Sequence, residues 1–324
     1  MSLRPVYWAA GLSAILVALS ACNGIAPATP AVSPHETRNA QSWISPEAVK
    51  ATSLLYISDL TTYEVYIYTF PGLKLVGKLT GFSQPQGECS DSAGDVWIVD
   101  TNTRQMFEFR HALKHAVKTL IDPTGYPVSC AIDPTTGNLA VTNIYDFSGA
   151  GGVLIYRHAT GTPGTFSNPR QFFYYFAGYD AAGDLYVSGQ DVNKAYMLSV
   201  LPKGKSSMST VSLKGGKIGF PGTVQWVRST LVLGDQECNH RKSSCLFEAS
   251  VSGTTAKISH VTAFTGACDV AQAVVVKNLV AGGDYQHCIH GTSSADIWAF
   301  PAGGVPIKRA GGVRAPVGAA ISTP

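Results

Sequence analysis

The sequence predicts an all-β protein, a six-bladed β-propeller of four-stranded blades. A pattern of short strands separated by tight turns recurs six times between Leu54 and the C-terminus. Glycine is abundant and charged residues make up only 14% of the chain, which suits strands and turns better than amphipathic helices, since about 25% is typical. A period of roughly 40 to 50 residues with four strands per unit is typical of blades around a channel.

The clearest copy of the repeat begins at Pro85. A Gly-containing turn follows its inner strand, and then come the apolar strand Val96–Asp100 and a third strand at Gln105–Arg110. Inner strands spaced 42 to 50 residues apart give the six repeats. Their predicted starts are Pro85, Pro127, Ala177, Pro221, Cys268 and Pro316.

The two ends of the repeat region complement one another. The segment Leu54–Asp59 has the pattern of a second strand, but no inner strand precedes it. The last segment, Pro316–Ser322, has the inner-strand pattern, but no further strand follows it. The sequence therefore predicts a ring closed by the C-terminal strand beside Leu54–Asp59, which leaves no long unpaired edge.

Residues 1–21 are predicted to be a signal peptide. Arg4 precedes an apolar run of about 13 residues, which is too short for the roughly 20 that a membrane-spanning helix needs. The segment Leu19–Cys22 resembles the lipobox of bacterial lipoproteins. This resemblance implies cleavage before Cys22, acylation of Cys22 and a place in the cell envelope, facing the periplasm or the exterior.

Residues 22–52 are predicted to be a lipidated flexible tether, because they are rich in Pro, Ala, Ser and Thr without periodicity. The propeller is then expected to span residues 53–324. About 270 residues are within the size of a single all-β domain, so no second domain is needed.

The repeat at Pro85 resembles the NHL-repeat family, whose pattern runs Pro-x-Gly, then Gly and Asp, then an apolar strand that ends Asp-Thr-x-Asn. The match covers Pro85–Phe109 well and the next repeat less completely. The resemblance implies the propeller fold and turn-capping roles for Asp100 and Asn102. It implies no activity, because propellers include lactonases, lyases, dehydrogenases and binding modules.

Six cysteines besides Cys22 predict three disulfides, since the number is even and the setting is exported. Cys89 and Cys130 lie one residue out of step on adjacent inner strands. Alternation directs them to opposite faces of their own sheets, and such faces meet between neighbouring blades. Cys238 and Cys245 bracket one loop, and Cys268 and Cys288 are expected on the same rim. The predicted pairs are Cys89–Cys130, Cys238–Cys245 and Cys268–Cys288.

Polar residues are predicted to gather on one rim, which carries the loops after second strands and before inner strands. We name it the second-strand rim. A channel mouth lined by such groups is the default ligand site. The candidate ligand-binding residues are Glu88, Asn143, Asp235, His240, Asp284 and His287.

A divalent ion such as calcium or zinc at this rim is one hypothesis. Oxygen and imidazole ligands from Asp235, His240, Asp284 and His287 would allow such an ion to activate water. Gluconolactonase-like six-bladed propellers hold a channel metal with Glu, Asn and Asp, and Glu88, Asn143 and Asp235 resemble that set without a surrounding motif. The alternative is that the acids cap turns and the histidines are exposed loop residues. No metal or cofactor is therefore assigned.

We expect a lipid-anchored, non-catalytic binding or assembly module for a protein, peptide or glycan, which touches the membrane through its anchor. The alternative is a metal-dependent lactonase-like hydrolase with its site at the channel mouth. An enzyme needs several converging ionisable groups, whereas a binding rim would expose aromatics such as Tyr145, Phe147 and Tyr285. The net charge of +3, without a basic cluster, predicts no nucleic-acid partner.

Overall fold

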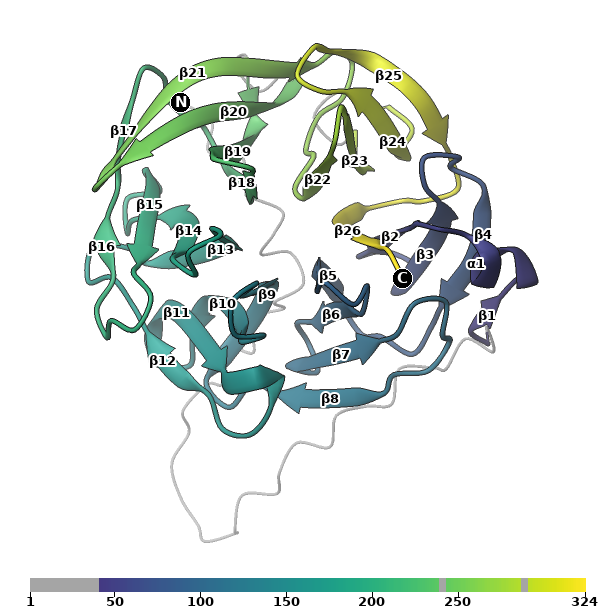
Figure 1. Ribbon diagram of the computed structural model, residues 1–324, viewed down its shortest axis with the longest axis horizontal. Coiled ribbons are helices and arrows are strands. Elements are labelled where there is room, and N and C mark those ends of the chain that lie inside the picture. The colour runs from purple at the N-terminus through teal and green to yellow at the C-terminus, as the bar shows by residue number, and fades with distance from the viewer. Residues whose placement is uncertain (1–40, 239–242, 287–290) are drawn as a thin grey trace, which may run out of the picture. The chain divides into compact units, whose positions relative to one another are not determined.

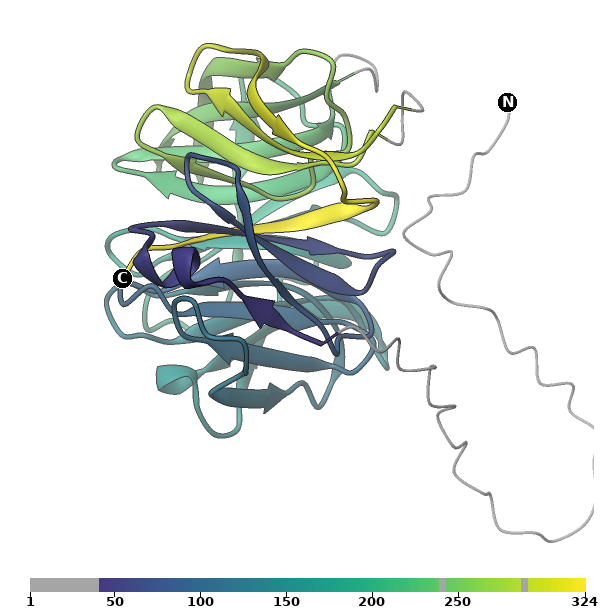
Figure 2. The ribbon, with the colours of Figure 1, turned by 90° about the vertical axis from the view of Figure 1, so that its right-hand side faces the viewer.

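The computed structural model describes residues 41–238, 243–286 and 291–324, which belong to a compact unit that begins at Asn39. This unit is built mainly of β-sheets that stand around a central axis (Figure 1). Figure 2 shows the sheets edge-on, with the C-terminus at the left. The helical segments α1 (Pro46–Lys50) and η2 (Arg157–Ala159) are short.

Three sheets each contain four antiparallel strands that are neighbours both along the chain and across the sheet. This meander is the unit that the sequence repeat predicts. The strands are β5 (Pro85–Ser90), β6 (Val96–Asp100), β7 (Gln105–Phe109) and β8 (Lys118–Ile121); β9 (Gly125–Ile132), β10 (Leu139–Asp146), β11 (Gly149–Tyr156) and β12 (Gly164–Phe166); β13 (Phe173–Tyr179), β14 (Leu185–Gln190), β15 (Tyr196–Leu201) and β16 (Ser209–Thr210).

A fourth sheet brings together strands from both ends of the described chain, in the order β1-β4-β3-β2-β26. The register of β2 and β26 runs from Leu54 opposite Ser322 to Asp59 opposite Pro316. The predicted insertion of the C-terminal strand beside Leu54–Asp59 is confirmed. The strands are β1 (Trp43–Ile44), β2 (Leu54–Asp59), β3 (Glu64–Thr69), β4 (Leu75–Leu79) and β26 (Pro316–Ser322).

The fifth sheet has nine strands: two four-stranded groups, which meet through a single parallel residue pair, Phe264 with Gly304, and the short strand β17, which pairs with β21. The inner strand expected at Cys268 begins later, at Ala273, because the intervening residues form the loop that leads to it. The strands are β17 (Ser212–Lys214), β18 (Pro221–Val227), β19 (Thr230–Glu237), β20 (Ser243–Ser252), β21 (Thr255–Phe264), β22 (Ala273–Val276), β23 (Leu279–Asp284), β24 (Ser294–Ala299) and β25 (Gly303–Ala310).

The folded unit includes residues that the sequence assigned to the tether. Trp43 and Ile44 pair with β4, and Ala48 of α1 is fully buried in the cluster below that sheet. The boundary predicted between residues 52 and 53 is therefore too late. A two-residue strand is too short to show a hydrophobic period, so composition alone concealed it.

Apolar side chains fill the spaces between neighbouring sheets. On β2, Tyr56 joins a cluster with β6 residues, whereas Leu55 and Ile57 join a cluster with residues of β23 and β24. This division follows from the alternation of side chains along a strand. Trp97 and Trp298 are buried in such clusters.

Two glycines on inner strands allow neighbouring sheets to approach closely. A Cβ atom at Gly87 would lie 2.6 Å from the carbonyl oxygen of Val128, and one at Gly318 would lie 2.0 Å from that of Gln86. Both distances are far below van der Waals contact. Any side chain at these positions would force the sheets apart.

Candidate functional site

The second-strand rim lies at the end of the ring opposite the C-terminus. Asp59 at the end of β2 pairs with Pro316 at the start of β26, so second strands end where the C-terminal strand begins. The structure describes four of the six candidate residues. His240 and His287 lie outside the described residues.

Asp235, at the end of β19, binds the backbone of its own sheet. Its carboxylate accepts the N–H groups of Gly219 at 2.9 Å, Phe220 at 3.0 Å and Glu237 at 2.9 Å. Gly219 and Phe220 belong to the loop that enters β18, so the carboxylate ties that loop to the end of the second strand. Only 3% of the residue is exposed. Both carboxylate oxygens are thus engaged in holding the loop.

The same arrangement recurs on two other sheets. Asp100, at the end of β6, accepts the N–H groups of Ser83 at 2.9 Å and Gln84 at 2.6 Å. Burial raises the pKa of Asp100, and these two N–H groups offset part of the rise. Asp59, at the end of β2, accepts the N–H of Arg314 at 2.5 Å. These contacts favour the turn-capping interpretation of the rim acids.

Asp284, at the end of β23, combines a backbone contact with an ion pair. Its oxygens accept the N–H of Cys268 at 3.0 Å and a guanidinium N–H of Arg309 at 3.1 Å. Arg309 also contacts Asp296 at 2.7 Å. Burial raises the pKa of Asp284 to about 6 even though these donors oppose the rise. Asp284 is therefore part of an ion-pair group within its own sheet.

Asn143, on β10, contacts polar side chains of its own sheet. Its Nδ2 donates to Thr124 Oγ1 at 3.0 Å and to Asp146 Oδ1 at 3.2 Å. Asn143 thus holds the loop that leads into β9 through Thr124. Its Oδ1 is a buried acceptor without a partner among the described residues.

Glu88 lies within β5, opposite Ile98, and not in a rim loop as predicted. It is 1% exposed, and neither carboxyl oxygen has a hydrogen-bond partner of normal geometry among the described residues. Burial raises its pKa well above the usual value, and the nearby Ala320 N–H offsets only part of the rise. Strand alternation directs the Glu88 side chain to the neighbouring sheet. The predicted position in a rim loop is therefore wrong.

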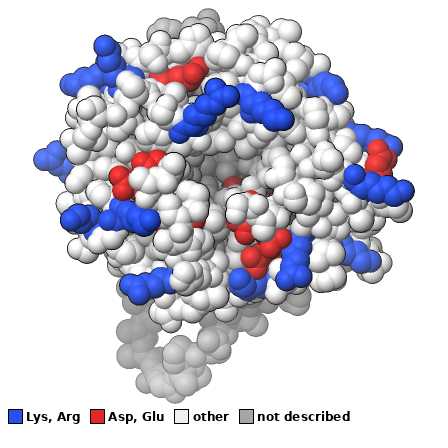
Figure 3. Space-filling model, in the orientation of Figure 1, with Lys and Arg blue, Asp and Glu red and all other residues white. Residues whose placement is uncertain are grey.

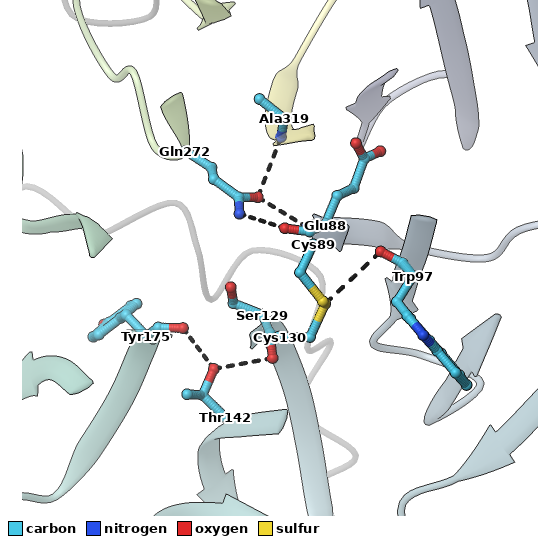
Figure 4. The surroundings of a disulfide bond; sticks show 9 residues. All are labelled: Glu88, Cys89, Trp97, Ser129, Cys130, Thr142, Tyr175, Gln272 and Ala319. Carbon is cyan, nitrogen blue, oxygen red and sulfur yellow. Dashed lines mark hydrogen bonds between the residues drawn. A yellow bond between two sulfur atoms is a disulfide. The ribbon is translucent and has the colours of Figure 1, made fainter. Parts of the chain in front are cut away.

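Around the central axis, side-chain amides form hydrogen bonds with backbone N–H and carbonyl groups of the inner strands (Figure 4). Gln272 accepts the N–H of Glu88 at 2.9 Å and donates to the carbonyl oxygen of Glu88 at 2.6 Å. It also accepts the N–H of Ala319 at 3.2 Å. Gln225 binds both the N–H and the carbonyl oxygen of Val275 in the same manner.

The centre of the ring is hollow in Figure 3, and inner strands line a cavity of about 180 Å³ there. Glu88 and Gln272 are among its lining residues. Because Gln225 and Gln272 already bind backbone groups, these amides have little capacity left for a ligand. The described contacts do not join Glu88, Asn143 and Asp235 into one ligand set, since each has partners in a different part of the ring.

Two of the three predicted disulfides lie wholly within the described residues. Cys89 pairs with Cys130 across two sheets, with Cα atoms 5.6 Å apart, and Cys238 pairs with Cys245, with Cα atoms 5.8 Å apart. For the third predicted pair, Cys288 lies outside the described residues. Cys238 and Cys245 also lie near Asp235, but sulfurs joined in a disulfide are not thiolate ligands for a metal.

A polar cavity of about 260 Å³ lies at the opposite end of the ring, between the β5–β8 and β9–β12 sheets. Oxygens of Asp91, Asp95 and Glu108 lie within 4.8 Å of one another there. Lys118 neutralises part of this charge through an ion pair with Glu108 at 3.2 Å. Burial and the charge of Asp91 raise the pKa of Asp95. This cavity could not be predicted from one repeat, because its walls come from two sheets.

Exposed apolar side chains occupy the turns between second and third strands. Tyr63 is 43% exposed, Phe147 is 56% exposed and Val192 is 66% exposed. Tyr126 and Tyr145 lie beside Phe147, with ring centroids 4.9 Å apart for the two tyrosines and 5.6 Å apart for Tyr126 and Phe147. The sequence pattern identified Tyr145 and Phe147 as candidate binding aromatics but not Tyr126, which lies at the start of a different strand, β9.

Comparisons with known proteins identify a fold and no family. No protein-family model matches the chain, and no curated protein matches its sequence. No helix in the described ranges is long and apolar enough to cross a membrane.

Solved structures resemble the chain over most of its length. A nidogen/laminin complex contains a chain with a TM-score of 0.65 at 9% identity, covering 83% of this chain and 98% of that one. A protein of unknown function from Bacteroides caccae has a TM-score of 0.62 at 11% identity, covering 84% and 99%. A functionally unknown protein from Desulfotomaculum acetoxidans DSM 771 has a TM-score of 0.56 at 11% identity, covering 84% and 99%. At these identities the likeness shows the all-β, propeller-like fold alone.

Proposed function

We propose that this chain is a lipid-anchored, six-bladed β-propeller that serves as a non-catalytic binding or assembly module through its second-strand rim. The nine-stranded sheet supports six blades, because its two four-stranded groups share only the pair Phe264–Gly304. Counted separately, they bring the number of strand groups around the central axis to six, of which the group β1-β4-β3-β2-β26 has five strands. The NHL-like pattern of Pro85–Phe109 agrees with this arrangement.

A place in the cell envelope is supported by disulfides. Cys89–Cys130 and Cys238–Cys245 suit an oxidising, extracytoplasmic compartment. The apolar run and the lipobox-like Leu19–Cys22 supply an export signal and an acylation site. The bound ligand would then be a protein, peptide or glycan of the periplasm or the cell exterior.

Binding rather than catalysis is favoured by one contrast at the rim. The carboxylates of Asp59, Asp100 and Asp235 accept hydrogen bonds from backbone N–H groups. They therefore do not converge on a reacting atom. The exposed side chains of the same rim include Tyr63, Phe147 and Val192. Aromatic and apolar groups exposed beside polar loops are typical of recognition surfaces.

Photo-crosslinking in intact cells tests the rim. A benzoylphenylalanine placed at Val192 in the full-length chain is expected to give discrete adducts with an envelope component. The control places the same group at Lys205, an exposed turn residue at the opposite end of the ring. Equal adducts from both positions, or none from Val192, would contradict a binding rim.

The anchor has its own test. Replacing Cys22 by Ser removes the predicted acylation site, and the variant is expected in the soluble fraction when membranes are sedimented. A variant that still sediments with the membranes would refute lipid anchoring and leave the rim proposal standing.

The alternative, a metal-dependent lactonase-like hydrolase, predicts that the purified protein contains a bound metal ion. Mass-spectrometric metal analysis of the full-length protein, purified without chelators or a His-tag, measures calcium and zinc directly. A stoichiometric ion that is lost on replacing His287 by Ala, with folding unchanged, would replace the binding proposal by the hydrolase.

A further inference from the structure

We propose that the second-strand rim binds an anionic polysaccharide along a strip of aromatic side chains flanked by two cations. The inference rests on the proposed binding function and names the ligand class. We call this surface the aromatic strip. Its rings are Tyr126, Tyr145, Phe147, Phe172 and Phe173, and its cations are Arg104 and Lys194.

The first half of the strip surrounds the β10–β11 turn. Tyr126 contacts Tyr145 at a tilt of 48° and Phe147 at 83°, so the three rings present faces in different directions. Arg104, from the β6–β7 turn, lies over Phe147 with its Cζ 5.2 Å from the ring centroid. Both tyrosines remain partly exposed, which leaves ring surface and hydroxyl groups for a ligand.

The second half continues onto the next sheet. The rings of Phe172 and Phe173 are 4.8 Å apart, and the Nζ of Lys194 lies 3.3 Å from the ring centroid of Phe173. The Gly151 N–H donates to the carbonyl oxygen of Phe172 at 2.8 Å. Since Gly151 follows the β10–β11 turn that carries Phe147, this hydrogen bond joins the two halves of the strip.

Neither cation of the strip is neutralised. No described carboxylate lies within ion-pair distance of Arg104 or Lys194, whereas Lys78, Lys118 and Arg309 all have such partners. Burial lowers the pKa of Lys194, and the Phe173 ring face is the group that its ammonium contacts. Two unpaired cations held against ring faces are complementary to an anion with an adjoining apolar face.

A polysaccharide fits this surface better than a peptide. The described part of the rim consists of turns and loops, so that part offers no free strand edge for β-augmentation. Sugar rings instead present C–H faces that stack on aromatic rings, and their hydroxyls can bond to Tyr126 and Tyr145. A carboxylate, sulfate or phosphate on the sugar would accept hydrogen bonds from Arg104 and Lys194. Charge on the sugar distinguishes this ligand from a neutral glycan.

Affinity electrophoresis of the full-length protein tests the proposal with polygalacturonate, its methyl-esterified form and poly-L-glutamate as probes. Retardation is expected with polygalacturonate, at least about fivefold weaker with the uncharged ester, and reduced by added salt because charge–charge attraction is screened. Phe147→Ala and the double change Arg104→Gln with Lys194→Gln are each expected to weaken binding about five- to tenfold. Lys205→Gln removes one exposed cation from the opposite end and should change nothing.

Three results would overturn the inference while leaving the binding rim intact. Equal retardation by poly-L-glutamate and polygalacturonate would assign the strip to acidic peptides. Crosslinking from Val192 without retardation by polygalacturonate would assign the rim to another ligand. Failure of the crosslinking itself would instead refute the proposed function. Retardation that survives the strip variants would place polygalacturonate binding elsewhere on the chain.

Discussion

Asp235 and Phe147 lie on the same rim of the molecule and have opposite surroundings. Asp235 is 3% exposed and accepts three backbone N–H groups. Phe147 is 56% exposed and has Arg104 over its ring. Charge at a channel mouth is therefore a poor guide to a ligand site when the backbone N–H groups of local loops need acceptors. We therefore expect the buried acids to control stability and the exposed aromatics to control binding.

Replacing Asp235 by Ala is expected to have the largest effect on stability. It leaves the N–H groups of Gly219, Phe220 and Glu237 without their acceptor, which we expect to cost about 3 kcal/mol of unfolding free energy. Equilibrium urea unfolding measures this loss. Asp235→Asn keeps an oxygen for Phe220 and Glu237, so it should cost roughly a third as much. Similar stability of Asp235→Ala and wild type would mean that the acid is not a loop anchor.

Replacing Gln272 by Leu is expected to cost about 2 kcal/mol, because it removes contacts with Glu88 and Ala319 across the ring closure. Gln225→Leu is the matched control, since Gln225 makes the two corresponding bonds to Val275 but none to β26. The two variants can be compared by urea unfolding. A larger loss for Gln225→Leu would contradict a special role of Gln272 at the closure.

Replacing Glu88 by Gln is expected to raise stability at pH 7, because burial favours a neutral side chain at this position and raises the pKa of Glu88. The folded state favours the protonated carboxyl, so wild-type stability should fall as pH rises above the ordinary Glu value of 4.5 towards the raised folded value. Unfolding between pH 4.5 and 8 should show this decline in wild type and a flatter profile in the variant. Glu47→Gln, at an exposed position, is the control. Equal slopes in wild type and Glu88→Gln would show that Glu88 does not titrate as described.

Replacing Phe147 by Ala is expected to change stability by less than about 0.5 kcal/mol, because exposed side chains contribute little to the folded state. Thermal unfolding followed by circular dichroism measures this small change. A large loss would show that the three-ring cluster is part of the core, and the contrast with Asp235 would disappear.

The strand pattern made much of the fold predictable. The segment Leu54–Asp59 matches β2, and the lack of an inner strand before it identified β26 as its partner. Alternation along inner strands was also enough to pair Cys89 with Cys130. These features depend on period-two geometry and on spacing, both of which are visible in one sequence.

The site was less predictable because its contacts join distant parts of the chain. Gln272 binds Glu88 across 184 positions, and a sequence gives no sign of such a bond. The sequence shows that Asp235 is acidic but not that its oxygens are occupied by Gly219 and Phe220. The aromatic strip likewise combines side chains from three sheets, so no single repeat contains it.

The most direct test of the central claim is the crosslinking yield from Val192 in two backgrounds, Asp235→Asn and Phe147→Ala, at a temperature where both are folded. We predict that Phe147→Ala lowers the yield at least about fivefold and that Asp235→Asn retains it. A folded Asp235→Asn protein that loses the adduct, while Phe147→Ala keeps it, would show that the acids form the ligand site and would contradict this account.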